Sequence, residues 1–491
     1  MSMKLSLETL DTLPEAVAKP AYARGDLTPG ILHFGVGNFH RAHQAVYLDR
    51  LFSKGLGRDF AIIGAGVMPA DKKAREIMAA QDFLTLVVEQ SADASDARIT
   101  GPMVDYIEPG QSARLIATMA DPAIRIVSMT ITEGGYFLDA TDTFDPTHPA
   151  IQKDAANPDA PETVFGLIVA GLRARRAAGL APFTVMSCDN IPHNGVVTRN
   201  AVCGMARLID GELAEWIAAN VAFPNGMVDR ITPATSDRER RLAAEEHGVA
   251  DQWPIFCEDF IQWVLEDNFP AGRPPLEEAG VQFVADVTPF ELMKIRILNG
   301  GHAVIAYPGG LLAIEFVHEA MEHPLIRAFL DKITAEEIRP VVPPVPDTDT
   351  RDYAALISHR FANPKIGDTE RRLCLDGSNR QPKFIVPSIR DAIAKGGKFT
   401  GLALESALWC RYCYGEDEAG REIAPNDPNW AELQPIARAA KARPEAWLAQ
   451  EAVYGALGQD TSFRAAFATA LNSLWKNGVE ATLTAYLEER L

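Results

Sequence analysis

The feature that most constrains the fold of this chain is a short apolar segment that runs into a glycine turn near the N-terminus. Residues 30–37 read Gly-Ile-Leu-His-Phe-Gly-Val-Gly, and residues 42–52 have the apolar spacing of a helix. In dinucleotide-binding folds, two glycines at such a turn let the chain reverse and let the backbone approach a pyrophosphate at the helix N-terminus. We therefore expect a Rossmann-type unit with Gly35 and Gly37 in the turn.

The glycine motif is incomplete, because His40 stands where the generic fingerprint has its third glycine. A second apolar strand at residues 60–66 follows at the spacing of a strand-helix-strand unit. The acidic residue that holds an adenosine ribose normally comes about 20 residues after the glycines. Asp71, in the loop after the second strand, is the nearest candidate and favours NAD over NADP. The adjacent Lys72 and Lys73 could instead face a 2′-phosphate.

Further strands and helices alternate along the first half of the chain. We expect strands at 83–89, 125–136 and 182–190, with a helix at 163–178. This alternation predicts an α/β fold with a mostly parallel, doubly wound sheet. The last two strands end in polar residues, at the edge where open α/β sheets bind ligands. Asn190 at that edge is either a donor to a substrate oxygen or a turn residue.

The composition changes near residues 280–288, where successive helices rich in alanine and leucine begin. We therefore expect a Rossmann-type domain over residues 1–285 and a mostly α-helical domain over residues 286–491. Small-molecule sites tend to form between domains, so the first helix of the second domain is a candidate for chemistry.

That first helix, predicted over residues 288–302, carries several polar side chains that chemistry can use. At about 100° per residue, Glu291, His302 and Asn299 lie about 60°, 80° and 140° around the axis from Lys294. Apolar neighbours surround Lys294, and desolvation lowers the pKa of a lysine, so it could accept a proton near neutrality. The alternative is a lysine whose amine extends to solvent.

Charge and composition exclude several classes of function. The 491 residues carry a formal net charge of -19, which is unfavourable for nucleic acid or anionic membranes as partners. The sequence contains no apolar run of about 18 residues and begins without a secretory leader. Six cysteines in so long a chain indicate a reducing compartment. We expect a cytoplasmic protein that acts on a small molecule.

Two motifs resemble metal sites but lack enough ligands. Cys410 and Cys413 form a single Cys-x-x-Cys in an aromatic, helix-like context, which favours burial in the core. His40 and His43 have a spacing that suits a metal, but no third ligand accompanies them, so we expect them to pack beside the glycine turn. We predict no metal site.

Five segments together give this chain a specific resemblance to a known family. They are Gly35–His43 (Gly-Val-Gly-Asn-Phe-His-Arg-Ala-His), Thr132–Tyr136 (Thr-Glu-Gly-Gly-Tyr), Ser187–Asn190 (Ser-Cys-Asp-Asn), Val228–Pro233 (Val-Asp-Arg-Ile-Thr-Pro) and Lys294–His302. Over nearly the whole chain, these segments resemble the long-chain polyol dehydrogenase family. The resemblance implies a Rossmann-type N-terminal domain, a helical C-terminal domain, NAD or NADP as cofactor and no metal. It also implies reversible oxidation of a polyol to a ketose, such as mannitol to fructose.

The resemblance also implies roles for individual residues. Lys294 would be the general base, Asn190 and Asn299 would bind the reacting oxygen, and His302 would orient the substrate. Glu291 would carry the proton between the lysine and water, although its spacing from Thr288 also suits a capping box. The polyol would be contacted by Asp229, Arg372 and Arg380, and a relative has lysine at the position of Arg380. The cofactor would be contacted by Gly35, Gly37, Asn38, Phe39, Asp71, Thr132 and Glu133.

Alternatives to mannitol oxidation stay open at this stage. The enzyme could prefer sorbitol or arabinitol, or it could reduce a uronate such as fructuronate. Uronate reductases of this family carry lysine where this chain has Gly134, which favours a neutral polyol. A silent NAD-binding regulator is disfavoured because it has no chemical need for Lys294, Asn299 and His302. The expected partners are a small polyol and its ketose, and the expected oligomeric state is a monomer.

Overall fold

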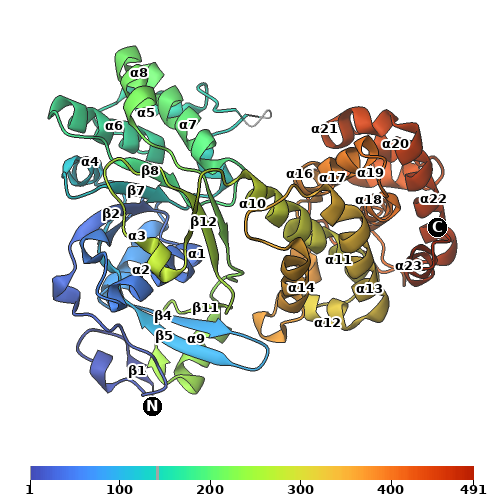
Figure 1. Cartoon of the computed structure of the whole chain (residues 1–491), viewed down its shortest axis with the longest axis horizontal. Coiled ribbons are helices and arrows are strands. Elements are labelled where there is room, and N and C mark those ends of the chain that lie inside the picture. Colours follow the sequence, from blue (N-terminus) through green and yellow to red (C-terminus); the bar gives the residue numbers. More distant parts are fainter. Residues whose placement is uncertain (1, 140–142) are drawn as a thin grey trace. The chain divides into compact units, whose positions relative to one another are not determined.

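The computed structural model describes residues 2–139 and 143–491. The chain divides into two compact units, Met1–Val287 and Thr288–Leu491. Figure 1 shows that the first unit combines strands with helices, whereas the second consists of helices. The predicted fold class, a Rossmann-type α/β domain followed by a mostly helical domain, is therefore confirmed.

The centre of the first unit is a five-stranded parallel sheet. Its order is β6 (Met103–Ile107), β3 (Ala61–Ala65), β2 (Pro29–Phe34), β7 (Ile126–Met129) and β8 (Thr184–Ser187). The first strand of this sheet in the chain, β2, lies in the middle, and the chain extends from it first to one side and then to the other. The reversal between β2 and β7 is the topological switch point at which such sheets bind ligands.

Alternating side chains of β2 enter two different cores, which explains why its sequence is mostly apolar, with the buried His33 as the polar exception. Leu32 and Phe34 pack with residues of α4 (Ser112–Ala120) and α6 (Val164–Ala177). Ile31 packs in the other cluster, with residues of α2 (Gln44–Ser53). The remaining helices of this unit are α1 (Asn38–Ala42), α3 (Asp71–Ala79), α5 (Pro149–Ala156), α7 (Asn194–Ile209), α8 (Gly211–Asn220) and α9 (Asp237–Glu246).

The strand predicted at residues 83–89 forms, but its assignment to the main sheet is wrong. It is β4 (Thr85–Gln90), which pairs antiparallel with β5 (Ser95–Thr100) and parallel with β11 (Ile255–Glu258) in a separate sheet. Residues 91–94 are too short a connection for a parallel crossover, so the next strand must fold back. The smaller sheets contain β9 (Gly226–Asp229), β12 (Gln262–Glu266) and β13 (Gln282–Val284), and β1 (Met3–Lys4) with β10 (Val249–Ala250).

The second unit opens with a helical segment whose geometry changes twice. It begins as α10 (Thr288–Met293), widens into a π-helical turn at Lys294–Asn299, and continues as α11 (Gly300–Leu311). The other helices are α12 (Val317–Glu322), α13 (Pro324–Ile333), α14 (Thr350–Phe361), α15 (Glu370–Leu373), α16 (Gly377–Phe384), α17 (Val386–Ala394), α18 (Thr400–Cys413), α19 (Trp430–Ala440), α20 (Glu445–Leu448), α21 (Glu451–Tyr454), α22 (Thr461–Asn477) and α23 (Val479–Leu487).

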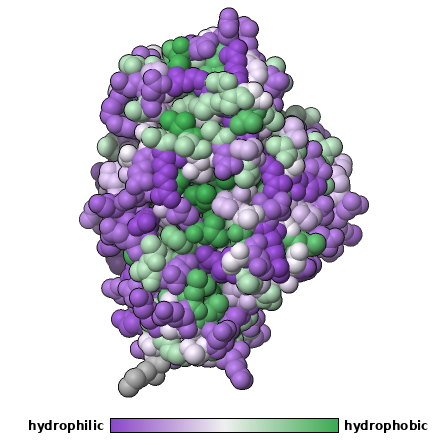
Figure 2. Space-filling model, turned by 90° about the vertical axis from the view of Figure 1, so that its left-hand side faces the viewer, coloured by the Kyte–Doolittle hydropathy of each residue, from purple (hydrophilic) through white to green (hydrophobic). Residues whose placement is uncertain are grey.

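Hydrophobic and hydrophilic residues are mixed on one face of the molecule (Figure 2). On the face drawn in Figure 2, green hydrophobic residues are interspersed with purple hydrophilic ones. Scattered apolar side chains of this kind are normal on folded proteins. In the described part of the chain, no helix has both the length and the apolar character needed to cross a bilayer.

Candidate active site

The glycine turn after β2 has the backbone geometry that the sequence predicts. Gly35 has a φ of +85°, and a Cβ there would lie 2.1 Å from the carbonyl oxygen of Thr130. The Thr130 hydroxyl donates to the Gly35 carbonyl at 2.6 Å, so the loops after β2 and β7 are bonded to each other. At Gly37, a Cβ would have the Gly35 carbonyl oxygen, at 3.9 Å, as its nearest neighbour among the described residues. Gly35 is thus required by packing, while Gly37 leaves open space beside the backbone.

Asn38 and Phe39, both predicted at the cofactor, have structural contacts of their own. The Asn38 amide donates to the carbonyl of Pro233 and to the hydroxyl of Thr235, each at 3.0 Å. Phe39 stacks on His43 with ring centroids 4.8 Å apart. The side chain of Asn38 therefore fixes the helix start against a second loop, and its backbone N–H is the group that could meet a phosphate.

Asp71 closes the loop after β3. Its Oδ2 accepts hydrogen bonds from the backbone N–H groups of Val67, at 2.9 Å, and Met68, at 2.8 Å. These bonds shape the loop at the end of the strand next to β2, where a Rossmann-type fold places its acidic ribose ligand. Asp71 thus shapes this loop, and the same carboxylate would also have to bind the ribose.

Asp189 ties together the loops after β7 and β8, and the sequence motifs assigned it no role. It is 7% exposed and accepts backbone hydrogen bonds from Ile131 at 3.0 Å and Thr132 at 2.8 Å. The Tyr136 hydroxyl donates to the same carboxylate at 2.8 Å. Burial raises the pKa of Asp189, and these three hydrogen bonds oppose that rise. The sequence signal that could have identified Asp189 is its position near the end of a predicted strand, within the Ser-Cys-Asp-Asn motif.

Thr132, predicted at the cofactor, has a strained backbone. Its φ is +61°, in a region that β-branched residues rarely adopt. Such strain persists only where surrounding bonds hold it, and it is often found at functional sites. Thr132 and its neighbour Glu133 are both exposed, beside the switch point. The bonds to Asp189 therefore hold an accessible, strained loop where a ligand would bind.

The two predicted substrate residues of the first unit lie at or just beyond the ends of strands. Asn190 comes directly after Asp189 and is exposed. Asp229 is the last residue of β9, is 5% exposed, and lies opposite Gln262 of β12. The next residue, Arg230, donates to Glu89 at 2.6 Å and to the Ala42 carbonyl at 2.6 Å, which fixes the strand end.

In the second unit, the predicted regular helix around Lys294 is wrong in its geometry. Residues 294–299 form a π-turn, in which the Gly300 N–H bonds to the Ile295 carbonyl five residues back. A turn closed by i→i+5 bonds contains more residues than an α-helical turn. The angular separation of about 140° expected between Lys294 and Asn299 therefore does not apply, and the wider turn brings residues five apart toward one side. Lys294 is 5% exposed.

His302 lies one turn further along, in α11, surrounded by positive charge. Its ring stacks on Phe361 with centroids 4.3 Å apart. Burial lowers its pKa well below the usual value, and the charges of Arg372, Arg360 and Arg380, followed by Lys294, lower it further. The imidazole is therefore neutral at neutral pH. Arg360, which is 5% exposed, was not predicted because it lies in no recognised motif.

The two arginines predicted at the substrate differ in their partners. Arg372 forms a two-pronged ion pair with Asp368, through Nε and Nη2. Arg380 donates to the carbonyl of Leu373 at 3.1 Å. Glu291, in α10, is 5% exposed and lies one helical turn before Lys294. The charges of Arg372, Arg380 and Lys294 all act on His302, so these predicted residues gather around one imidazole.

Two buried polar atoms in this cluster have no hydrogen-bond partner among the described residues: Oδ1 of Asn299 and Nε2 of His302. Leaving such a group unpaired costs about 1–3 kcal/mol. A ligand rich in hydroxyl groups can both donate to and accept from these atoms. The second unit therefore offers a buried amine, an amide and an imidazole suited to a hydroxylated substrate.

The motifs that resembled metal sites lie in packed surroundings. Cys410 and Cys413 are each 1% exposed in α18, as predicted. His40 stacks on His33 with centroids 3.6 Å apart, and His43 Nε2 lies 2.8 Å from the Gln262 carbonyl. Within residues 2–139 and 143–491, no three His, Cys, Asp or Glu side chains are grouped as they would be to hold a metal ion.

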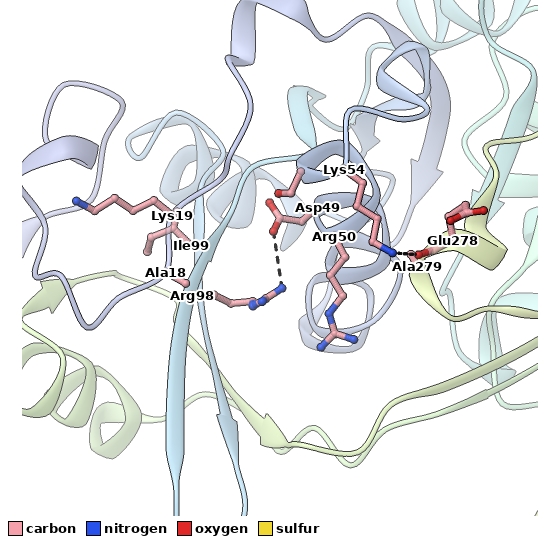
Figure 3. A pocket seen from close by; sticks show the side chains of 10 residues that line it. Ala18, Lys19, Asp49, Arg50, Lys54, Arg98, Ile99, Glu278 and Ala279 are labelled. Atoms are coloured by element: carbon pink, nitrogen blue, oxygen red, sulfur yellow. Dashed lines mark hydrogen bonds and ion pairs between the residues drawn. The ribbon is translucent and has the colours of Figure 1, made fainter.

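A pocket of about 480 Å³ in the first unit is separate from these residues. Figure 3 shows Arg98 directed at Asp49, at 3.9 Å, and the Lys54 amine bonded to the Glu278 carbonyl. Arg50 pairs with Glu89 at 2.8 Å. The pocket lining thus carries more cations than carboxylates, and among its described residues only Arg98 pairs with a carboxylate of the lining itself. Its lining consists of Ala18, Lys19, Asp49, Arg50, Ser53, Lys54, Arg98, Ile99, Glu278 and Ala279, which includes no residue predicted for the site.

Comparison with known proteins gives matches along most of the chain. The family model described as the mannitol dehydrogenase Rossmann domain matches residues 29–278, and that of the mannitol dehydrogenase C-terminal domain matches residues 286–475. A mannitol 2-dehydrogenase of Cereibacter sphaeroides is 60% identical over 476 residues, covering 97% of this chain and 100% of the relative. One from Aspergillus fumigatus is 43% identical over 498 residues, covering 99% of each.

Two solved structures resemble the whole chain. The Pseudomonas fluorescens mannitol 2-dehydrogenase ternary complex with NAD and D-mannitol has a TM-score of 0.88 at 45% identity, covering 99% of this chain and 100% of the other. A D-sorbitol dehydrogenase in substrate-free form has a TM-score of 0.91 at 38% identity, covering 98% of this chain and 100% of the other.

Proposed function

Because the chain belongs to the mannitol dehydrogenase family, we propose that it is an NAD-dependent enzyme that oxidises mannitol to fructose and catalyses the reverse reduction. One observation carries the chemistry of this proposal. The buried amine of Lys294 shares a short helical segment with the unpartnered Oδ1 of Asn299 and Nε2 of His302. A substrate with several hydroxyl groups would satisfy both atoms and present one hydroxyl to the amine.

The proposed base is Lys294. Oxidation of a secondary alcohol requires the hydroxyl proton to leave as the hydride leaves carbon, and a neutral amine can accept that proton. Burial disfavours the ammonium form and so makes the neutral amine accessible. Glu291, also buried and one turn away, would pass the proton on toward water.

The amides of Asn299 and Asn190 would stabilise the oxygen from which the proton is removed. Negative charge develops on that oxygen, and preorganised N–H donors lower its energy. Removal of one such donor typically costs ~100–1,000-fold in turnover. The assignment of Asn190 draws on the family resemblance and on its exposed position after β8.

The remaining polar residues would bind the other hydroxyl groups. His302 is neutral because burial and the neighbouring arginines lower its pKa, so it can both donate and accept a hydrogen bond. The charges of Arg372 and Arg380 act on the same imidazole, so we propose that their N–H groups donate to substrate hydroxyls near it. We propose that Asp229 accepts a hydrogen bond from a substrate hydroxyl. This set suits a neutral polyol through hydrogen bonds along its length.

The residues of the first unit fit a dinucleotide. A Cβ at Gly37 would meet no described atom closer than 3.9 Å, and Gly35 makes the turn possible. The backbone from Gly37 to Phe39 would hold the pyrophosphate, Asp71 the ribose, and the loop at Thr132 and Glu133 the nicotinamide end. NAD supplies the hydride acceptor when bound. We further propose that the reaction needs no metal, because Lys294 provides a base and the two asparagines stabilise the oxygen.

Steady-state rates on a panel of substrates test this function. Mannitol, sorbitol and arabinitol would be oxidised with NAD and with NADP, and fructose and fructuronate would be reduced with NADH. We expect the highest kcat/KM for the mannitol and fructose pair with the NAD form. A higher kcat/KM for sorbitol than for mannitol would instead indicate a sorbitol dehydrogenase, like the D-sorbitol dehydrogenase that the chain also resembles. A preference for fructuronate would overturn the assignment of a neutral substrate.

A further inference from the structure

The π-turn that carries Lys294 and Asn299 is fastened by a residue within it. Arg296 is 7% exposed. Its Nη1 donates to the carbonyl of Val341, and its Nη2 forms an ion pair with Asp391. We propose that Arg296 and Asp391 form a clamp that sets the position of Lys294 and Asn299. The proposal rests on the function proposed for those two residues.

A π-turn needs such support because it is rarely stable by itself. Its i→i+5 hydrogen bonds replace the more favourable α-helical pattern, and π-turns occur mostly as single turns inside α-helices, frequently at functional sites. The segment from Lys294 to Asn299 contains neither proline nor glycine, so nothing in its covalent structure forbids an ordinary α-helix. Contacts from outside the turn must therefore favour the wider form.

The clamp reaches two other segments of the second unit. Val341 ends a short 3-10 turn (Arg339–Val341), and Asp391 lies in the middle of α17. The π-turn packs against α14, α16 and the second π-turn of this unit, Thr334–Ile338, which precedes the 3-10 turn. The guanidinium bonds both segments at once, so it holds the turn to each of them.

Asp391 supplies the carboxylate that pairs with the Arg296 guanidinium, from a side chain that is itself 43% exposed. The guanidinium of Arg296 is almost fully buried, and its Nε has no hydrogen-bond partner in the described chain. A buried cation deprived of its carboxylate is strongly unfavourable, so the structure around it rearranges. Arg296 would then turn toward water, and the π-turn would lose its register. Because Arg296 bonds to Val341 and Asp391, its effect on substrate passes through the turn, and it is a positioning residue.

The test uses Asp391→Asn in the full chain, with Asp391→Glu as the rescue variant. Hydrogen exchange measured by mass spectrometry would report on residues 294–299, and kcat, KM and the pH profile would report on catalysis. We expect faster exchange in this segment and a kcat lowered about 100-fold, which is the loss that misplacing a catalytic group by about 1 Å can cause. NADH affinity should stay unchanged, and Asp391→Glu should recover most of the activity.

A matched control is available in the same unit. Arg411 is also buried, at 7% side-chain exposure, and pairs with the partly exposed Glu418 at 3.7 Å. Glu418→Gln removes that carboxylate without touching the π-turn. It should lower the unfolding temperature while leaving the exchange of residues 294–299, kcat and the pH profile as in the wild type. If Asp391→Asn does not fold, the same measurements are made on Arg296→Lys.

The outcomes separate the clamp from the proposed function. Unchanged exchange at residues 294–299, an unchanged kcat, or equal effects in Glu418→Gln would overturn the clamp. Exchange does not depend on turnover, so it is informative even if Lys294 is not the base. Retention of a tenth of the activity by Lys294→Ala would instead overturn the role of base proposed for Lys294 and leave the exchange result standing.

Discussion

Asp189 accepts a hydrogen bond from the backbone N–H of Thr132 at 2.8 Å, and Thr132 has a φ of +61°. The buried carboxylate thus supports a strained residue at the switch point of the sheet. Because Ile131 also donates to it, both oxygens face N–H groups. A group that can only accept is therefore required at this position.

Replacing that carboxylate by an amide should disturb the loop. In Asp189→Asn, one acceptor becomes an NH₂ group that faces a backbone N–H. We expect a loss of about 1–3 kcal/mol in the free energy of unfolding. We also expect weaker NADH binding, because Thr132 and Glu133 lie on this loop. Denaturant unfolding and a fluorescence titration with NADH measure the two effects.

Asp154 provides the control for that variant. It is 1% exposed and accepts backbone hydrogen bonds from Glu162 at 2.9 Å and Thr163 at 2.7 Å. Asp154→Asn should destabilise the protein similarly but leave NADH affinity unchanged. Equal losses of NADH affinity in both variants would show that Asp189 has no special link to the cofactor loop.

Lys294→Ala should lower turnover by about 100–10,000-fold, the range expected for loss of a general base. NADH binding should persist, because the proposed cofactor residues belong to the first unit. Lys294→Met, which keeps an apolar stem in the buried position, should be equally slow and more stable. Retention of a tenth of the wild-type rate at neutral pH would mean that the lysine is not the base.

Asp71→Ala should raise the activity with NADP relative to NAD. A carboxylate repels a 2′-phosphate and accepts hydrogen bonds from the ribose. The same variant loses two bonds to the loop backbone, so total activity should also fall. The ratio of kcat/KM with the two cofactors isolates the specificity effect, and Lys72→Ala is the control. An unchanged ratio in Asp71→Ala would remove it from the ribose site.

Chelators should leave the enzyme active. Prolonged treatment with EDTA or phenanthroline, followed by desalting, should not change the rate of mannitol oxidation. Cys410 and Cys413 are packed in the core, and burial raises the pKa of both thiols well above the usual value. A loss of activity that added zinc restores would contradict the proposed mechanism.

The sequence predicted the sheet but not every strand in it. The glycine turn and the alternation of strands with helices are local patterns, and they led to the correct fold class. The strand at 83–89 was misplaced because pairing depends on where the chain goes next, and residues 91–94 turn it back. Periodicity identifies a strand without identifying its neighbours.

The candidate site was predictable as a set of residues but not as geometry. The motif from Lys294 to His302 was visible, but the π-turn was not, because contacts of Arg296 with distant residues accompany it. Asp189 and Arg360 were missed for the same reason. Their importance comes from partners far away in the sequence, such as Thr132 for Asp189 and His302 for Arg360.

The central claim is that Lys294, and not His302, exchanges the proton with substrate. Oxidation needs a neutral base and should become faster as pH rises, whereas reduction needs the protonated acid and should become slower. An unperturbed lysine titrates at about 10.4, and burial should move the group downward. Burial and neighbouring cations lower the pKa of His302 well below the usual value, so its charge should not change in this range.

The pH dependence of kcat in both directions for His302→Ala tests this claim most directly. The variant should be slower and bind substrate more weakly, yet keep opposite pH dependences for oxidation and reduction, governed by one common group. If both dependences disappear in His302→Ala, the histidine is the proton acceptor and the role assigned to Lys294 is wrong.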